Sequence, residues 1–323
     1  MKLLRQLLAS PIGRAVLALV GMFILGLVFN ADGAFFHWTT HRDMLRQLSV
    51  YGILSCGMTL VIITGGIDLS VSSVLAVCAV GFSILTIHQQ ANPWLAIALV
   101  LAGGTAVGAL SGTLVGRFKI QPFVVTLAAM VLLRGLAKHL SGGQKISTYI
   151  AASDRSVELP AIFEGIDARV LGDNVSIVTL VFLACVAVSA FLLGHVRLGR
   201  YFYATGGNAE AARLSGVPVT RTLVLAYALS GLFSAIAGVC QAAQEQQGDP
   251  ETGSGYELQA IAIVVIGGTN LAGGRGGMAL TLVGALTIGY LQKILSINAV
   301  GEASRLMLTG AIIVCAVLLQ RRK

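Results

Sequence analysis

Long apolar runs alternate with short polar or glycine-rich segments along almost the whole chain. Ten runs approach the roughly 20 residues that an apolar helix needs to cross a bilayer. They lie near residues 15–30, 47–64, 70–88, 94–115, 122–140, 175–194, 222–243, 258–272, 277–297 and 302–319. The pattern predicts an all-α, polytopic membrane protein, a single domain over 1–323 with about ten transmembrane helices, several of them short or broken by Gly pairs.

The composition excludes a soluble protein. Of the 323 residues, 56% are hydrophobic and only 11% are charged, and the mean hydropathy is +0.84. A soluble domain carries roughly a quarter charged residues, so this chain has too few to cover a water-facing surface. All the cysteines fall inside the apolar runs, where they act as small apolar residues and indicate neither a disulfide framework nor a metal cluster.

The net charge of +8 is best explained as a signal of orientation. Cytoplasmic loops of membrane proteins carry the excess of Lys and Arg. Placing the N-terminus inside puts 13 of the 22 bases on the cytoplasmic side and five on the other. We therefore expect both termini in the cytoplasm and no nucleic-acid partner. The inner bases are Lys2, Arg5, Arg14, Arg117, Lys119, Arg197, Arg200, Arg213, Arg221, Arg275, Arg321, Arg322 and Lys323.

The cytoplasmic segment 195–222 predicts a short helix outside the membrane, spanning about 205–217 with its turns. Asn208 is a helix-starting residue and Pro218 a stop. The helix is amphipathic, so it could rest on anionic lipid headgroups or be gripped by another protein. The residues singled out here are Gly206, Gly207, Asn208, Glu210, Ala211, Arg213, Leu214 and Gly216.

Two polar interruptions fall at the cytoplasmic ends of apolar runs. GGIDLS at 65–70 contains Asp68, and an ionisable residue at membrane depth is a functional candidate by default. The alternative is that Asp68 caps the helix that begins near Ser70. IGGTNLAGGRGG at 266–277 indicates tight turns with close backbone contacts. The candidates for a gate or pathway are Gly65, Gly66, Asp68, Ser70, Gly267, Gly268 and Asn270.

Three further features concern the runs and their connections. Arg134 lies within the fifth run and is a candidate for a polar contact inside the pathway. Glycines recur every fourth residue from Gly104 to Gly116, a stripe that predicts close packing inside the chain rather than a dimer seam. The segment 141–174 is a polar outer loop, either a solvated connector or a surface that receives a partner.

The motifs that the chain lacks argue against enzyme chemistry. It contains no GxxxxGK[ST] phosphate-binding loop, no HExxH and no set of metal ligands. No nucleophile or metal site is apparent, so a membrane enzyme is the weakest interpretation. We expect no cofactor in this chain.

The chain resembles the membrane-spanning permease subunit of bacterial ribose-type sugar ABC importers. The resemblance runs from about the second run to the C-terminus, while the first 45 residues match poorly. Ser72 stands where that family usually has Gly. The motifs that carry the resemblance are GMTLVIITGGIDLSVSSVLA at 57–76, QPFVVTLAAMVLLRGLA at 121–137, RLGRYFYATGGNAEAARLSGV at 197–217 and GYELQAIAIVVIGGTNLAGGRGG at 255–277.

The resemblance implies a type II ABC importer-like permease in a bacterial inner membrane. Its partners would be a cytoplasmic ATP-binding subunit that carries ATP and Mg²⁺, a periplasmic sugar-binding protein and a second permease copy or paralogue. Segment 205–217 would then be the coupling helix that sits in a cleft of the ATPase. The implied activity is import of a monosaccharide by alternating access, with no covalent chemistry in this chain.

Two alternatives stay open. One is a permease of the same family that imports autoinducer-2. The other is an ion-coupled secondary transporter, which would need carboxylates at membrane depth, where the runs offer only Asp68. The identity of the sugar is beyond what the sequence can tell.

Overall fold

The computed structural model describes residues 10–150 and 154–301, together with 303–305, 307–308, 310–311 and 314. The described elements are almost entirely helical. They are α2 (Pro11–Val28), η1 (Ala34–Phe36), α3 (Trp38–Ile63), α4 (Val71–Ser83), η2 (Ile84–His88), α5 (Pro93–Phe118), α6 (Pro122–Ser141), β1 (Tyr149–Ile150), β2 (Arg155–Ser156), α7 (Ala161–Asp167), β3 (Arg169–Val170), β4 (Val175–Ser176), α8 (Ile177–His195), α9 (Arg197–Gly207), α10 (Ala209–Leu214), α11 (Val219–Glu245), α12 (Tyr256–Gly267) and α13 (Met278–Ile297).

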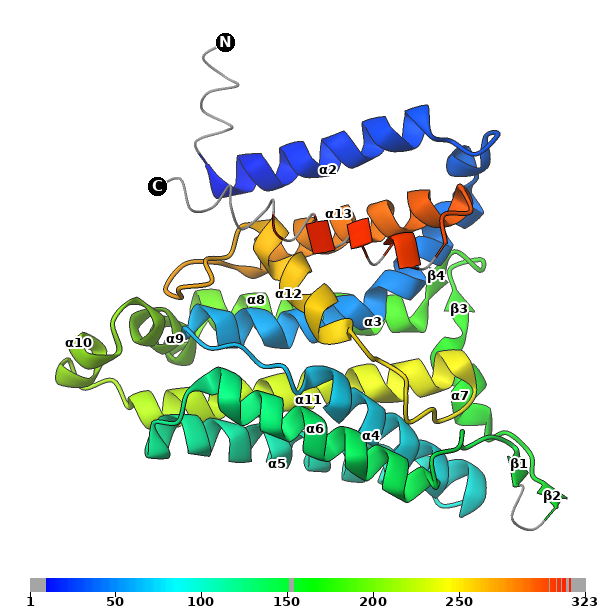
Figure 1. Ribbon diagram of the computed structural model, residues 1–323, viewed down its shortest axis with the longest axis horizontal. Helices are drawn as coiled ribbons and strands as arrows, with labels where there is room; N and C mark the ends of the chain where they lie inside the picture. The colour runs from blue at the N-terminus through cyan, green and yellow to red at the C-terminus, as the bar shows by residue number, and fades with distance from the viewer. Residues whose placement is uncertain are drawn as a thin grey trace.

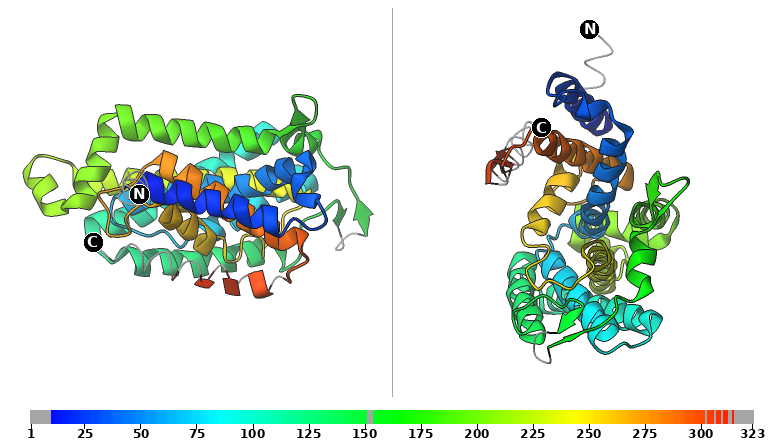
Figure 2. Two further views of the ribbon diagram at one scale, coloured as in Figure 1. Left: turned by 90° about the horizontal axis from the view of Figure 1, so that it is seen from above. Right: turned by 90° about the vertical axis from the view of Figure 1, so that its right-hand side faces the viewer.

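The long helices lie side by side along one axis of the molecule (Figure 1). In that view α2 and α13 lie at the top and α5 and α6 at the bottom, while α9 and α10 project from one end and the short strands lie at the other. We call these the α10 end and the strand end. The end-on view of Figure 2 shows α2 at the edge of the bundle. This arrangement suits helices that cross a bilayer together.

Two helices, α3 and α11, form the core of the bundle. Ile53, Leu54 and Met58 of α3 are fully buried, and α11 packs against α3, α4 and α5. The buried hydroxyls of α3 bond to carbonyls one turn earlier, and Thr59 also bonds to Thr281 of α13 at 2.7 Å. Such bonds between helices satisfy polar groups that lipid cannot.

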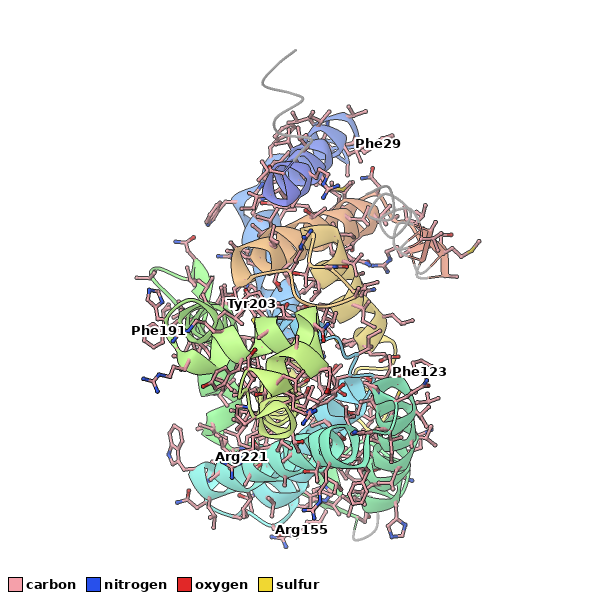
Figure 3. The ribbon with its side chains drawn as sticks, turned by 90° about the vertical axis from the view of Figure 1, so that its left-hand side faces the viewer. Phe29, Phe123, Arg155, Phe191, Tyr203 and Arg221 are labelled. Atoms are coloured by element: carbon pink, nitrogen blue, oxygen red, sulfur yellow. The ribbon has the colours of Figure 1, made fainter. Side chains whose placement is uncertain are left out.

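Apolar side chains cover the outer rim of the bundle. Figure 3 shows Phe29, Phe123 and Phe191 at its periphery, and each is more than half exposed. On a soluble protein such a rim would promote aggregation, whereas in a bilayer it faces lipid. The distribution of exposed apolar residues therefore agrees with the membrane fold.

The structure confirms the predicted class of a polytopic, helical membrane protein. Seven described helices are long and apolar enough to cross a membrane, and two shorter apolar helices accompany them. These nine match the first nine predicted runs. The tenth, 302–319, falls mainly outside the described residues.

The helix in the eighth predicted run, 258–272, is shorter than the run. The helix there, α12, has 12 residues and ends at Gly267 because Gly268 takes a left-handed conformation with φ 103°. Twelve helical residues rise about 18 Å, well short of the roughly 30 Å hydrocarbon core. α12 therefore enters the bundle only part of the way, and residues 268–277 return as a loop.

The glycine stripe on α5 packs against α11, which confirms the predicted internal packing. A Cβ added at Gly104, Gly108 or Gly112 would meet the backbone of α11. The contact is reciprocal, since a Cβ at Gly231 of α11 would overlap the Gly104 carbonyl oxygen. Two helices approach this closely only where at least one of them carries no side chain at the contact.

We expect Gly108→Ala to destabilise the folded chain by about 1–3 kcal/mol, the usual cost of overpacking a close contact. The new methyl group would overlap the Tyr227 carbonyl oxygen, and a backbone atom cannot turn aside as a side chain can. Gly103→Ala is the matched control, because a Cβ at Gly103 meets nothing within 4 Å. Thermal unfolding of the two purified variants in detergent measures the difference. Equal midpoints would contradict the assigned packing.

The outer loop 141–174 folds into small elements at the strand end. β1 pairs with β2 and β3 with β4, both antiparallel, and these strands were not predicted. Arg46 of α3 ties the loop to the bundle through two hydrogen bonds of 2.7 Å to Asp167. The side chain of Arg169 bonds to Asp43 at 2.6 Å. The loop is therefore anchored to α3 rather than free in solution.

Candidate functional site

Three glycine-rich segments meet at the α10 end of the bundle, in what we call the glycine junction: Gly65, Gly206, Gly273 and Gly274. The Gly274 N–H donates to the carbonyl of Ile63 at the end of α3, at 2.9 Å. A Cβ at Gly206 would overlap that same carbonyl oxygen. A Cβ at Gly273 would lie 2.8 Å from the Gly206 carbonyl and 2.9 Å from Gly65. Backbone therefore touches backbone across three segments of the chain.

The glycine junction joins candidates that the sequence treated separately. Gly65 comes from the first polar interruption, Gly273 and Gly274 from the second, and Gly206 from the predicted coupling segment. The sequence contained a signal, a Gly pair in each of the three segments, but nothing in it indicated that they touch. The structure links the projecting helices to both interruptions.

The other candidates of the second interruption shape its own loop. A Cβ at Gly267 would overlap the backbone of Leu280 in α13, so this glycine packs α12 against α13. The side-chain oxygen of Asn270 accepts from Ala272 N at 3.1 Å, and its amide nitrogen donates to Gly273 O at 3.3 Å. Asn270 thus folds the loop that carries Gly273 to the junction.

Asp68 is 2% exposed and holds the first interruption in place. Its Oδ1 accepts hydrogen bonds from Ser70 N at 3.0 Å and from Ser70 Oγ at 2.5 Å. Its Oδ2 accepts from Ser230 Oγ of α11 at 2.7 Å. The carboxylate therefore closes the turn before α4 and ties that turn to α11.

Two further contacts fix the same turn. The Thr126 hydroxyl of α6 donates to the carbonyl of Ile67 at 3.2 Å. Gly66 lies against Tyr227, whose hydroxyl a Cβ would overlap. The turn at 65–70 is thus held between α6 and α11, close to the glycine junction.

Two helices project from the α10 end, α9 and α10. The sequence predicted the second one, and Asn208 does begin it, with its side-chain oxygen accepting from Ala211 N at 2.9 Å. The separate helix α9 was missed, although its fully buried Phe202 anchors it to the core. Tyr203 of α9 donates a hydrogen bond to Gly276 O at 3.0 Å, and Figure 3 shows it at this end.

The surface of α10 combines an ion pair with an apolar side chain. Arg213 binds Glu210 through two hydrogen bonds of 3.0 and 2.6 Å. This contact lowers the pKa of the Glu210 carboxyl, so the pair stays charged at neutral pH. Leu214 is 74% exposed, whereas Ala212 is buried against the chain. Gly216 takes a left-handed conformation with φ 83° and turns the chain toward α11.

Arg134 of α6 lies toward the strand end and binds the loop that connects α11 to α12. Its guanidinium donates to the carbonyls of Pro250 and Thr252 at 2.7 and 2.8 Å. The neighbouring Lys138 pairs with Glu251 at 2.6 Å. Arg134 also lines a cavity of about 280 Å³ with Ser72, Ser73 and Glu257. The structure thus places this candidate far from the glycine junction, where it holds the connection from α11 to α12.

The described residues hold no group of three or more His, Cys, Asp or Glu side chains that could bind a metal ion. Cys56, Cys78, Cys185 and Cys240 are free and buried, while Cys315 lies outside the described residues. The candidate site consists of closely packed backbone, hydrogen bonds and a projecting surface.

The fold and these features define a multi-pass membrane protein whose polar interruptions and projecting helices meet at one end. Residues 41–317 match the family described as branched-chain amino acid transport system / permease component, and the chain belongs to this family. Members are transport permeases, so this chain is a transport subunit and not itself an enzyme. The match begins near the point where the sequence motifs begin.

Several curated relatives align with nearly the whole chain. It is 40% identical over 305 residues to the ribose import permease protein RbsC of Escherichia coli (strain K12), covering 94% of this chain and 92% of that protein. It is 34% identical to the L-arabinose transport system permease protein AraH of the same strain, covering 94% and 88%. It is 33% identical to the fructose import permease protein FruF of Bifidobacterium longum (strain NCC 2705), covering 97% and 89%. No solved structure matches the chain.

Proposed function

We propose that this chain is the membrane-spanning permease subunit of an ATP-driven importer that carries a monosaccharide of the ribose, arabinose or fructose class into the cytoplasm. The observation that carries the proposal is the similarity over more than nine tenths of the chain to import permeases for these sugars. The projecting α10 and the absence of a phosphate-binding loop in the sequence support it, because the ATPase must then be a separate chain.

The proposed coupling runs from α10 through α9 to the glycine junction. A partner ATPase that grips α10 moves α9, because Asn208 alone separates the two helices. Gly206 lies on the Ile63 carbonyl and beside Gly273, so a shift of α9 pushes on the end of α3 and on the loop before α13. The bundle would thereby switch between inward-open and outward-open states, which is alternating access.

The proposed assembly contains a cytoplasmic ATP-binding subunit with its ATP and Mg²⁺, a periplasmic sugar-binding protein at the strand end and a second permease copy. Its place is a bacterial inner membrane. The α10 end faces the cytoplasm in this proposal, with both termini inside, because Lys and Arg gather in the connections on that side.

Uptake by a reconstituted complex tests the function. We expect proteoliposomes that contain the permease and its ATPase to take up a labelled sugar from the loaded binding protein only with ATP, and to continue when an ionophore collapses ion gradients. Uptake that persists without ATP and stops with the ionophore would favour the ion-coupled alternative and overturn the proposal.

The transported sugar can be identified through the binding protein. A ligand raises the apparent stability of the protein that it binds by mass action. Melting shifts of the purified binding protein against ribose, arabinose, fructose and autoinducer-2 therefore identify the cargo. A shift with autoinducer-2 alone would replace the monosaccharide in the proposal.

We expect reversing the charge of either Glu210 or Arg213 to reduce uptake about tenfold, while insertion into the membrane stays normal. Each single reversal breaks the pair on α10 and places two like charges side by side on the proposed coupling surface, which changes the charge pattern that a partner must complement. Uptake and ATP hydrolysis in the same proteoliposomes measure the uncoupling. Normal uptake in both variants would remove these side chains from the coupling surface.

The double variant Glu210→Arg with Arg213→Glu is the matched control. It rebuilds the ion pair within α10 but exchanges the charges that a partner meets. If the pair served only to stabilise α10, the double variant would regain uptake. We expect uptake by the double variant to stay impaired, because the proposed contact with the partner depends on which of the two positions is acidic and which is basic.

A further inference from the structure

A polar cavity of about 310 Å³ lies between α3, α11, α12 and α13. The residues that line it fall in the last turn of α11 and in the second half of α13, and Tyr256 is the first residue of α12, so the cavity belongs to the half of the bundle near the strand end. Its polar lining is dominated by neutral amides. These are Gln47, Gln241, Gln244, Gln259 and Gln292. We call it the glutamine cavity.

Two of these amides already have partners. Gln241 donates to Glu245 Oε1 at 2.6 Å, and Gln244 donates to the Arg46 carbonyl at 3.1 Å. Both contacts hold the end of α11 in place. These two side chains therefore shape the wall of the cavity, each with one amide N–H already engaged.

The amides of Gln47 and Gln259 have no hydrogen-bond partner in the described part of the chain. They come from different helices, α3 and α12, and both line the cavity. Each amide offers one carbonyl acceptor and two N–H donors. Gln47 is exposed and Gln259 partly exposed, so both amides are open to a ligand that enters the cavity. A hydroxyl both donates and accepts, so a polyhydroxylated ligand can use both sides of each amide.

An aromatic pair supplies the apolar part of the cavity. The rings of Tyr51 and Tyr256 lie 4.4 Å apart between centroids and are tilted by 47°. Small-molecule sites combine aromatic walls with a few placed polar groups. The C–H face of a sugar ring packs on such rings while its hydroxyls turn toward the amides.

The volume of the cavity and the charges that line it restrict the class of ligand further. About 310 Å³ lies at the lower end of the range for small-molecule sites, which suits one sugar ring rather than a chain of them. The ionisable groups among the lining residues are Lys293, Arg305 and the two tyrosines. Without an acid in its lining, the cavity disfavours a cationic ligand.

We propose that the glutamine cavity is a monosaccharide site of the permease itself, at which Gln47 and Gln259 bind ring hydroxyls of the passing sugar. The inference rests on the proposed function and extends it. Selection of the sugar then occurs twice, once in the binding protein and again in the membrane.

The test compares Gln47→Leu and Gln259→Leu with the wild type in the reconstituted complex, at saturating loaded binding protein. The probes are labelled ribose, arabinose and fructose and, for the sugar that is carried, its analogues that each lack one hydroxyl. The wild type should carry the parent sugar faster than at least one analogue. Each variant should carry the parent about tenfold more slowly, as expected when one hydrogen bond is removed, and should lose that preference.

The loss of preference distinguishes a role in sugar binding from a role in folding, because a damaged fold slows transport of the parent sugar and of its analogues alike. Gln144→Leu is the control variant, since Gln144 is exposed and lies outside the cavity. If both cavity variants keep the wild-type rates and preference, the inference fails while the proposed function stands. If the wild-type complex carries no sugar with ATP, the proposed function itself fails.

Discussion

Replacing Gly206 with Ala is expected to reduce sugar uptake about 100-fold. The added methyl group would overlap the carbonyl oxygen of Ile63 and crowd Gly274 N. Both are backbone atoms, so the helix and not a side chain must move. A cost near 3 kcal/mol, at the upper end of overpacking, corresponds to a factor of about 100 when it falls on one of the two transport states.

Uptake and ATP hydrolysis of the reconstituted complex measure the effect. Gly194→Ala is the control, because Gly194 belongs to the neighbouring α8 and a Cβ there meets nothing within 4 Å. We expect the Gly206 variant to insert and to hydrolyse ATP with little transport. If it carries sugar at more than half the wild-type rate, the glycine junction does not transmit the movement.

Asp68→Ala is expected to have the second large effect, a loss of about 3–5 kcal/mol of stability. The change removes three hydrogen bonds to a buried carboxylate and leaves Ser230 Oγ and Ser70 N without that acceptor. A bond to a charged group contributes about 1.5–3 kcal/mol, and orphaned partners add to the loss. Thermal unfolding in detergent measures the change in stability.

Asp68→Asn separates this structural role from ion coupling. The amide keeps the shape and an acceptor for Ser70, and Ser230 can accept where it formerly donated. We expect this variant to fold and to take up sugar within about threefold of the wild type, since it keeps most of these contacts. A folded variant without any uptake would show that the carboxylate acts in transport, as the ion-coupled alternative requires.

Much of the fold follows from local sequence, because each transmembrane helix forms its backbone hydrogen bonds within itself and is visible in the sequence as an apolar run. The limits come from residues whose conformation depends on packing. Gly268 ends α12 inside an apolar run, which the run itself does not reveal. The helix α9 was missed because it is too short and too polar for a membrane span and ends in the Gly206–Gly207 pair, and Gly is a weak helix former that favours a turn.

The candidate site was predicted in parts. Asn208 and the residues after it indicated α10, because a capping side chain acts within its own turn. The glycine junction was beyond reach, since Gly65, Gly206 and Gly274 lie far apart in the chain and meet only after folding. The glutamine cavity was missed for the same reason, because its amides come from four helices and no spacing links them.

The glycine junction limits how this protein can change. Where a large side chain meets another, a mutation on one side is often rescued by a smaller residue on the other. Here the contacting atoms are backbone atoms of Ile63 and of glycines, so no exchange for a smaller side chain makes room. A substitution at Gly206 therefore has no simple suppressor at Gly65, Gly273 or Gly274, and we expect revertants to restore the glycine itself.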